Sequence, residues 1–207
     1  MEITETRRSP MESARKLILF IAQSLDGYIA REDESLDWLL QYESAGDNGY
    51  SAFYETVGTI LLGRRTYEWI VRNVQSGFPY PGKECYVFSR SLSGQTDHVT
   101  FVSQDIASFT ASLKTQPGRD IWIVGGADVL QPLLRDNLVD ELIIHIAPTI
   151  IGGGIPLFKA GTREMALHLV KVTQYNQFVE LRYQCRPTDR SDDEAPPRPR
   201  STNRSHP

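Results

Sequence analysis

Short runs of apolar and β-branched residues recur between residues 15 and 186, and polar or turn-forming residues separate them. Runs of this composition predict β-strands. The last three runs follow one another without a helix between them, so they are expected to pair antiparallel. The eight strands are expected over residues 16–22, 59–62, 85–89, 99–102, 121–125, 141–151, 166–172 and 178–185.

Helical stretches lie between the earlier strands, over residues 51–57, 66–73, 105–114 and 128–137. Ser103 is the expected N-cap of the third helix, and Pro132 must lie in the first turn of the fourth helix or kink it. Alternation of strands and helices favours a sheet covered on both faces. The pattern therefore predicts an α/β fold: a three-layer sandwich with a mixed, mainly parallel sheet of about eight strands and antiparallel C-terminal strands.

The two ends differ from the middle of the chain. Residues 1–14 are polar and include a second methionine, Met11, which is an alternative start of translation. Between residues 187 and 207 the only hydrophobic residue is Ala195, and four acids balance four arginines. Such a segment cannot offset the entropy lost on ordering. We expect an N-terminal extension (1–14), one domain (15–186) and a disordered tail (187–207); a partner-binding segment is the alternative for the tail.

Composition and charge exclude several classes of protein. The net charge of −4 gives no concentration of positive charge for nucleic acid. The longest apolar runs are far short of the ~20 residues of a membrane-spanning helix, and no export signal is recognisable. The two cysteines, Cys85 and Cys185, suit free thiols in a reducing cytoplasm. The four histidines lack the spacing of a zinc site, so no metal is expected.

Three predicted strands end in segments suited to phosphate: Gly-Arg-Arg-Thr (63–66), Ser-Arg (89–90) and Gly-Gly (125–126). Helix starts offer free N–H groups, arginines offer forked donors, and glycines allow close approach. Each segment alone is also compatible with an ordinary turn or junction. Together, at the sheet edge where ligands of α/β folds bind, they predict an extended, multiply charged ligand such as a dinucleotide.

Five segments, in order, carry a resemblance to a known family: IAQSLDGYIA (21–30), LGRRTYE (62–68), YVFSR (86–90), IVGG (123–126), and DEL to PTIIGGGIPLF (140–158). The set resembles the dihydrofolate reductase superfamily, in the branch of the riboflavin-biosynthesis reductase domain. The resemblance covers roughly residues 15–186 and implies a dihydrofolate reductase-like fold. Relatives commonly pair through the later strands, so a homodimer is expected.

The resemblance also implies NADPH as the cofactor. The residues that it assigns to NADPH are Gly63, Arg64, Arg65 and Thr66 at the phosphates, Ser89 and Arg90 at the adenosine 2′-phosphate, Gly125, Gly126 and Ala127 at the pyrophosphate and nicotinamide ribose, and Ala22 and Ile29 at the nicotinamide.

Two carboxylates are candidate proton donors by the same resemblance. Folate reductases use a carboxylate at the start of the helix before the second strand, and Asp47 is the best positional match; an N-cap role is the alternative. Asp26 follows the riboflavin-type pattern, and turn chemistry before Gly27 is its alternative role.

Three residues are candidates for the substrate side. Trp38 resembles a substrate-pocket tryptophan, although surface packing is equally allowed, and Phe53 follows Asp47 on the predicted helix. His145 interrupts an apolar strand and is either a core residue or a pocket residue whose titration would make activity pH-dependent near neutrality. The acidic cluster within residues 32–37 is expected to be solvated surface.

The predicted function is that of an NADPH-dependent reductase. It would transfer a hydride to a C=N or related bond of a small pterin-like or pyrimidine-like substrate, and it is most similar to 5-amino-6-(5-phosphoribosylamino)uracil reductase of riboflavin biosynthesis. The alternative is a catalytically degenerate NADPH-binding or dimerising module with the same fold.

Overall fold

The computed structural model describes residues 15–42 and 46–185. The predicted extension (1–14), the predicted tail (187–207) and Arg186 lie outside the described residues. The main sheet consists of β1 (Leu17–Ser24), β3 (Val57–Gly63), β4 (Glu84–Phe88), β5 (Thr100–Val102), β6 (Asp120–Gly125), β7 (Glu141–Ala147), β9 (Leu167–Tyr175) and β10 (Phe178–Cys185).

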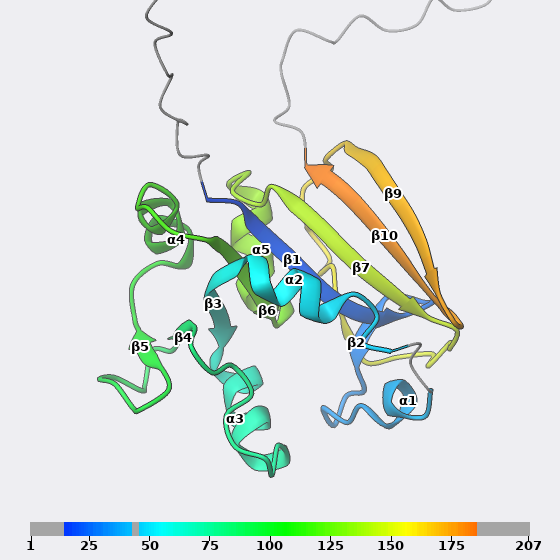
Figure 1. The fold of residues 1–207 in the computed structure, drawn as a ribbon, viewed down its shortest axis with the longest axis horizontal. Helices are drawn as coiled ribbons and strands as arrows, with labels where there is room; N and C mark the ends of the chain where they lie inside the picture. The colour runs from blue at the N-terminus through cyan, green and yellow to red at the C-terminus, as the bar shows by residue number, and fades with distance from the viewer. Residues whose placement is uncertain (1–14, 43–45, 186–207) are drawn as a thin grey trace, which may run out of the picture.

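The order of these eight strands is β5-β4-β3-β6-β1-β7-β10-β9 (Figure 1). The strands from β5 to β7 in this order are parallel. Strand β10 is antiparallel to β7, and β9 is antiparallel to β10. The mixed, mainly parallel sheet with an antiparallel C-terminal end confirms the predicted fold class. A separate two-stranded sheet pairs β2 (Tyr28–Ala30) with β8 (Ile155–Pro156).

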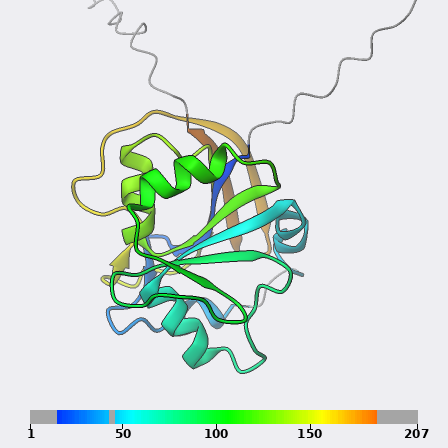
Figure 2. The same cartoon turned by 90° about the vertical axis from the view of Figure 1, so that its left-hand side faces the viewer.

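Helices cover both faces of the main sheet. Helices α2 (Tyr50–Thr56) and α3 (Arg64–Asn73) pack on one face, and α4 (Ile106–Lys114) and α5 (Ala127–Arg135) pack on the other. Figures 1 and 2 show α2 and α5 on opposite sides of the central strands. Because successive strand side chains point to opposite faces, neighbouring residues of one strand enter different cores. None of the helices within 15–42 and 46–185 is long and apolar enough to cross a membrane.

A third, smaller apolar cluster lies where β7 and β10 meet the segment after β2. Helix α1 (Asp37–Leu40) carries Trp38, which packs with Ala147 and Phe178. Burial of a side chain as large as that of Trp38 fixes this segment against the ends of the two strands. The segment thereby forms one wall of the cavity described below.

Several sequence-based boundaries were wrong. The sixth strand ends at Ala147 rather than at residue 151, because Pro148 follows and offers no N–H to a ladder. The N-cap of α4 is Asp105, not Ser103: its carboxylate accepts from the Ser108 N–H at 2.9 Å. Pro132 is the sixth residue of α5 and so lies in its second turn, not in the first. The short elements α1, β2 and β8 were not predicted.

Candidate functional site

A cleft of about 1050 Å³ opens at the carboxyl edge of the parallel strands. Strands β3, β4 and β6 end side by side there, at Gly63, Phe88 and Gly125. The segments that follow these strands therefore meet, although they are far apart in sequence. All eleven residues assigned to NADPH by resemblance line this one cleft: Ala22, Ile29, Gly63, Arg64, Arg65, Thr66, Ser89, Arg90, Gly125, Gly126 and Ala127.

The backbone around Gly63 and Gly126 is tightly apposed. A Cβ added to Gly63 would lie 3.2 Å from Cγ2 of Val129 and 3.5 Å from the Gly126 nitrogen. Helix α3 begins directly after Gly63, and α5 begins directly after Gly126. Two helix N-termini with free N–H groups thus lie at the cleft, an arrangement that favours anionic groups.

The two arginines after Gly63 already have carboxylate partners. Arg64 donates from Nε to Oε1 of Glu68 at 2.7 Å. Arg65 pairs with Glu34 at 2.7 Å, and Glu34 also lines the cleft. The prediction that the acidic segment is merely solvated surface was therefore wrong for Glu34. Its carboxylate also pairs with Arg72 at 3.3 Å and so joins two arginines of α3.

Ser89 and Arg90 have different structural roles in the turn after β4. The Ser89 hydroxyl is buried and accepts from the N–H groups of Ser91, at 3.2 Å, and Leu92, at 2.9 Å. These bonds fix the turn. Arg90 follows on the exposed side and lines the cleft.

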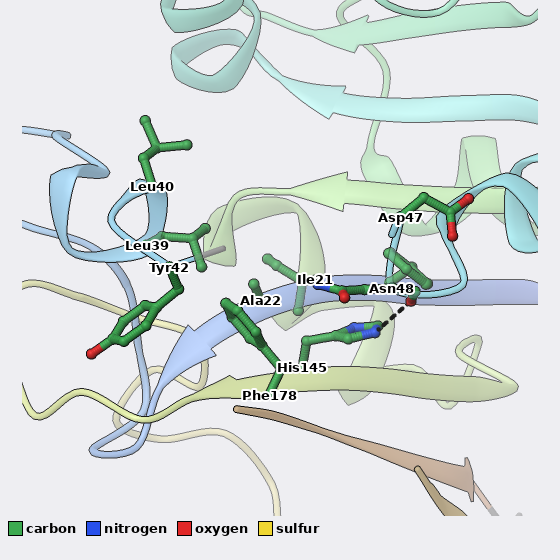
Figure 3. Close-up of a pocket in the computed structure, with 10 residues that line it drawn as sticks. Ile21, Ala22, Leu39, Leu40, Tyr42, Asp47, Asn48, His145 and Phe178 are labelled. Atoms are coloured by element: carbon green, nitrogen blue, oxygen red, sulfur yellow. Dashed lines mark hydrogen bonds between the residues drawn. The ribbon is translucent and has the colours of Figure 1, made fainter. Parts of the chain in front are cut away.

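A second cavity, of about 460 Å³, adjoins the cleft; we call it the chamber. Ile21, Ala22 and Leu39 line both cavities, so a molecule in the cleft and a molecule in the chamber would meet at these side chains. Figure 3 shows the chamber between β1, β7 and the segment before α2. The chamber is lined by Phe20, Ile21, Ala22, Leu39, Leu40, Tyr42, Asp47, Asn48, His145 and Phe178.

His145 is the buried titratable group of the chamber wall. Only 4% of the residue is exposed, and its ring stands 4.8 Å from that of Phe20. Its Nε2 lies 3.2 Å from the Asn48 carbonyl oxygen (Figure 3) and 3.4 Å from Oε2 of Glu180. Burial lowers the pKa of His145, and the Glu180 carboxylate partly opposes that shift. His145 thus stays a candidate on the substrate side.

Asp47 lines the chamber but its carboxylate is engaged elsewhere. One oxygen accepts from the Gly49 N–H at 3.0 Å and the other from the Ser51 N–H at 2.7 Å. These bonds tie Asp47 to Gly49 and to the first turn of α2 and lower the pKa of Asp47, so the exposed group stays ionised near neutral pH. Figure 3 shows the carboxylate directed away from His145. The N-cap of α2 is Gly49, so the N-cap alternative for Asp47 was wrong. Asp47 lies two residues earlier and accepts from N–H groups where the helix begins.

Asp26 joins two loops outside both cavities. Its carboxylate accepts from Oγ of Ser24 at 2.6 Å and from the N–H groups of Ile151, at 3.2 Å, and Gly152, at 2.8 Å. The Ser24 hydroxyl is the largest cause of its lowered pKa. Asp26 lines neither the cleft nor the chamber, and its bonds are those of turn chemistry.

Trp38 and Phe53 lie behind the chamber rather than in its lining. Trp38 is 1% exposed within the third apolar cluster. Phe53 is stacked on Phe20, with ring centroids 4.4 Å apart, and Phe20 faces the chamber. Both were predicted to bind substrate, but burial places them as supports of the wall. Sequence reasoning missed Glu180, although an acid inside an apolar strand was a signal for it.

A sequence model of the RibD C-terminal domain matches residues 15–181. The chain belongs to this family. The RibD-type chain is similar to YwjB of Bacillus subtilis (strain 168). The two are 49% identical over 170 residues, which cover 82% of this chain and 97% of YwjB.

Solved structures agree with the family. A protein of Shewanella sp. PV-4, assigned by its name to riboflavin biosynthesis, superposes with a TM-score of 0.75 at 28% identity, covering 83% of this chain and 99% of that one. Dihydrofolate reductase from Enterococcus faecalis, complexed with NADP(H), gives a TM-score of 0.58 at 18% identity and coverages of 83% and 97%. The latter likeness concerns the fold, which is dihydrofolate reductase-like.

The residues of the cleft fit a nicotinamide dinucleotide. The glycine at position 63 allows β3 and the start of α5 to lie close together, two helix N-termini suited to anionic groups lie at the cleft, and Arg90 is exposed in its lining. The lining of the cleft therefore combines donors suited to phosphates with the apolar side chains of Ala22 and Ile29.

Proposed function

We propose that this RibD-type protein is an NADPH-dependent reductase of a small pterin-like or pyrimidine-like substrate. The observation that carries the proposal is the junction of the two cavities at Ala22. A cleft suited to a dinucleotide and an aromatic-lined chamber meet there, as hydride transfer between two bound molecules requires.

The protein's own part in the reaction is to bind, orient and exclude water. The segments after β3, β4 and β6 would hold the phosphates, and Ala22 and Ile29 would pack on the nicotinamide. When bound, NADPH supplies the hydride from its nicotinamide ring. The chamber would hold the acceptor with its C=N bond toward Ala22.

The lining of the chamber supports a flat, heterocyclic substrate. Phe20 and Phe178 offer aromatic faces, while Asn48 and His145 offer polar atoms along one side. Flat nitrogen heterocycles match such a combination of apolar faces and a hydrogen-bonding edge. Substrates related to the uracil intermediate of riboflavin biosynthesis belong to this class.

Titration of the full-length protein with NADPH and NADH tests the cofactor half of the proposal. Trp69 lines the cleft, so quenching of its fluorescence should report binding. Charge-assisted bonds from Arg90 to the 2′-phosphate should contribute about 1.5–3 kcal/mol, roughly a 10- to 100-fold preference for NADPH. Arg90→Ala should lose that preference and keep NADH affinity. Absence of binding of either nucleotide would contradict the proposal.

A catalytically degenerate NADPH-binding module is the second candidate. The bonds of Asp47 to the N–H groups of Gly49 and Ser51 favour it, because they occupy the carboxylate that, by position, best matches the acid of folate reductases. Tight NADPH binding without turnover of any reduced pterin or aminouracil precursor would decide for the module.

We further propose a homodimer formed through β9. This edge strand exposes Leu169, Val170 and Val172 by 48%, 47% and 55%, and it pairs with β10 on one side. Exposed apolar edge strands invite pairing or aggregation unless another surface covers them. Light scattering after size exclusion should give twice the 23.4 kDa chain mass, and Val172→Lys should shift the mass toward one chain.

A further inference from the structure

Three adjacent strands place a row of residues on the face that carries the chamber. Ala22 of β1 pairs with His145 of β7, and His145 pairs with Glu180 of β10. Ala22 lines both the cleft and the chamber, and His145 lines the chamber. Glu180, 3% exposed, lies on the far side of the imidazole from Ala22. Across the sheet, the imidazole of His145 therefore lies between Ala22, next to the cleft, and the carboxylate of Glu180.

Hydrogen bonding assigns the protons of the imidazole. A carbonyl oxygen only accepts, so the contact with Asn48 at 3.2 Å requires that Nε2 of His145 carries a hydrogen. The Glu180 carboxylate, 3.4 Å away, faces the same N–H. The ring nitrogen left to gain and release a proton is therefore Nδ1.

The surroundings of His145 come from four elements. Burial lowers its pKa, Glu180 raises it, the Asn48 carbonyl raises it, and Arg182, on β10, lowers it. From β9 the Tyr175 ring stacks at 5.9 Å, and from β1 comes the Phe20 ring. The Asp47 carboxylate, next to Asn48, contributes to raising the pKa of Tyr175. A buried imidazole with an acid behind it is held in one orientation and can accept charge.

Backbone packing keeps this arrangement closed. Gly49 has a φ of 79°, and a Cβ added to it would lie 2.7 Å from the Tyr175 hydroxyl and 3.9 Å from Oε2 of Glu180. The absence of a side chain at this position lets the loop before α2 lie over the carboxylate. The Asn48 carbonyl is thereby brought to the imidazole.

We infer that His145 is the general acid of the proposed reduction and that Glu180 is the positioning residue that supports its protonated form. This inference rests on the proposed reductase function. As the carbon of the substrate C=N bond gains the hydride, Nδ1 gives its proton to the nitrogen, and the imidazole is left neutral. Solvent then returns a proton to Nδ1. The donor is thus a strand residue beside the chamber, and Asp47 keeps its bonds to the start of α2.

The first test needs neither cofactor nor substrate. Long-range ¹H–¹⁵N spectra of the full-length protein follow the His145 ring through a pH titration, and His145→Gln identifies its signals. Glu180→Gln should shift the His145 titration to lower pH, and Glu180→Asp should partly restore it. Glu55→Gln, an exposed acid on α2, is the matched control and should cause no shift. An unchanged titration in Glu180→Gln overturns the role of Glu180.

The second test is the pH dependence of turnover. With a dihydropterin as probe, kcat should fall as pH rises through the His145 titration, and Glu180→Gln should move this fall to lower pH. His145→Gln should lower kcat by about 100-fold or more and leave NADPH affinity within about 3-fold, while His168→Gln should change neither. Circular dichroism and melting curves show whether each variant is folded. If His145→Gln fails to fold, the pH profile of Glu180→Gln, which preserves the volume of the side chain, still tests the proposal.

The outcomes separate the two proposals. Wild-type protein that binds neither nucleotide and reduces no probe contradicts the reductase function itself. Wild-type protein that turns over, with His145→Gln retaining both its kcat and its pH profile, overturns the assignment of His145 alone.

Discussion

The cleft and the chamber are built in different ways. The phosphate-suited part of the cleft consists of three short continuous segments, each of which directly follows a parallel strand and contains glycine or arginine residues. The chamber is made of single side chains from β1, α1, the loop before α2, β7 and the start of β10. The two cavities share only the wall around Ala22 among the described residues.

This difference indicates how each region would recognise the ligand proposed for it. The cleft depends on backbone N–H groups and charges whose positions follow from local turns, so it suits the invariant phosphates of a cofactor. The chamber depends on how distant strands and helices pack, so its shape and polarity can change with single substitutions. Specificity for the substrate should therefore be sensitive to packing, and cofactor binding should be sensitive to local backbone.

Trp38→Ala should separate the two regions most strongly. Removing a side chain that is 1% exposed leaves a cavity under the chamber and should lower the free energy of unfolding by about 3–5 kcal/mol. Urea denaturation measures this loss. In protein that is still folded, NADPH affinity should change little, because Trp38 does not line the cleft. An equal loss of NADPH affinity would show that the regions are coupled.

Gly63→Ala should damage the cleft and spare the chamber. The new Cβ would stand 3.2 Å from Val129 and push the start of α5 away from β3. NADPH affinity should fall by about 10-fold, roughly 1.4 kcal/mol, in fluorescence titration. Gly153→Ala, whose Cβ would meet nothing within 4 Å, is the matched control. Unchanged affinity in Gly63→Ala would show that α5 can shift freely.

The chamber should also impose a pH dependence on stability. Burial holds the pKa of His145 below its ordinary value of 6.5, so the unfolded chain binds the proton more readily. Above pH 6.5 the group has no effect; below it, stability should fall by at most about 1.4 kcal/mol per pH unit until the folded imidazole also titrates. Denaturation between pH 5 and 8 should show this component in the wild type and not in His145→Gln.

Glu34→Gln should give the smallest change in NADPH affinity, and it tests whether Arg65 is available to the ligand. Its carboxylate would compete with a cofactor phosphate for Arg65, and a partly exposed pair of this kind contributes about 0.2–1 kcal/mol. The variant should bind NADPH about 2- to 5-fold more tightly at low salt. Weaker binding instead would mean that Glu34 orients Arg65 for the ligand.

The sequence alone was sufficient for the order of the main strands and helices and for the cleft. Gly63 to Thr66, Ser89 with Arg90, and Gly125 with Gly126 each form a continuous segment after an apolar strand, and parallel strands bring such segments to one edge. Local patterns therefore predicted where they would meet. Strand and helix boundaries at Ala147 and Asp105 depended on individual proline and capping contacts.

Only the tertiary structure decided what forms the chamber. Trp38 and Phe53 are aromatic residues in plausible positions, and packing against neighbouring side chains turned both away from the cavity. The Asp47 carboxylate accepts a hydrogen bond from an N–H group of α2 instead. Glu180 joined His145 because β7 and β10 pair in one register, and a shift of one residue would place the carboxylate on the opposite face. His145 and Glu180 are 35 residues apart in sequence, so no local pattern encodes their pairing. It is decided by the register of β7 and β10 in the folded sheet.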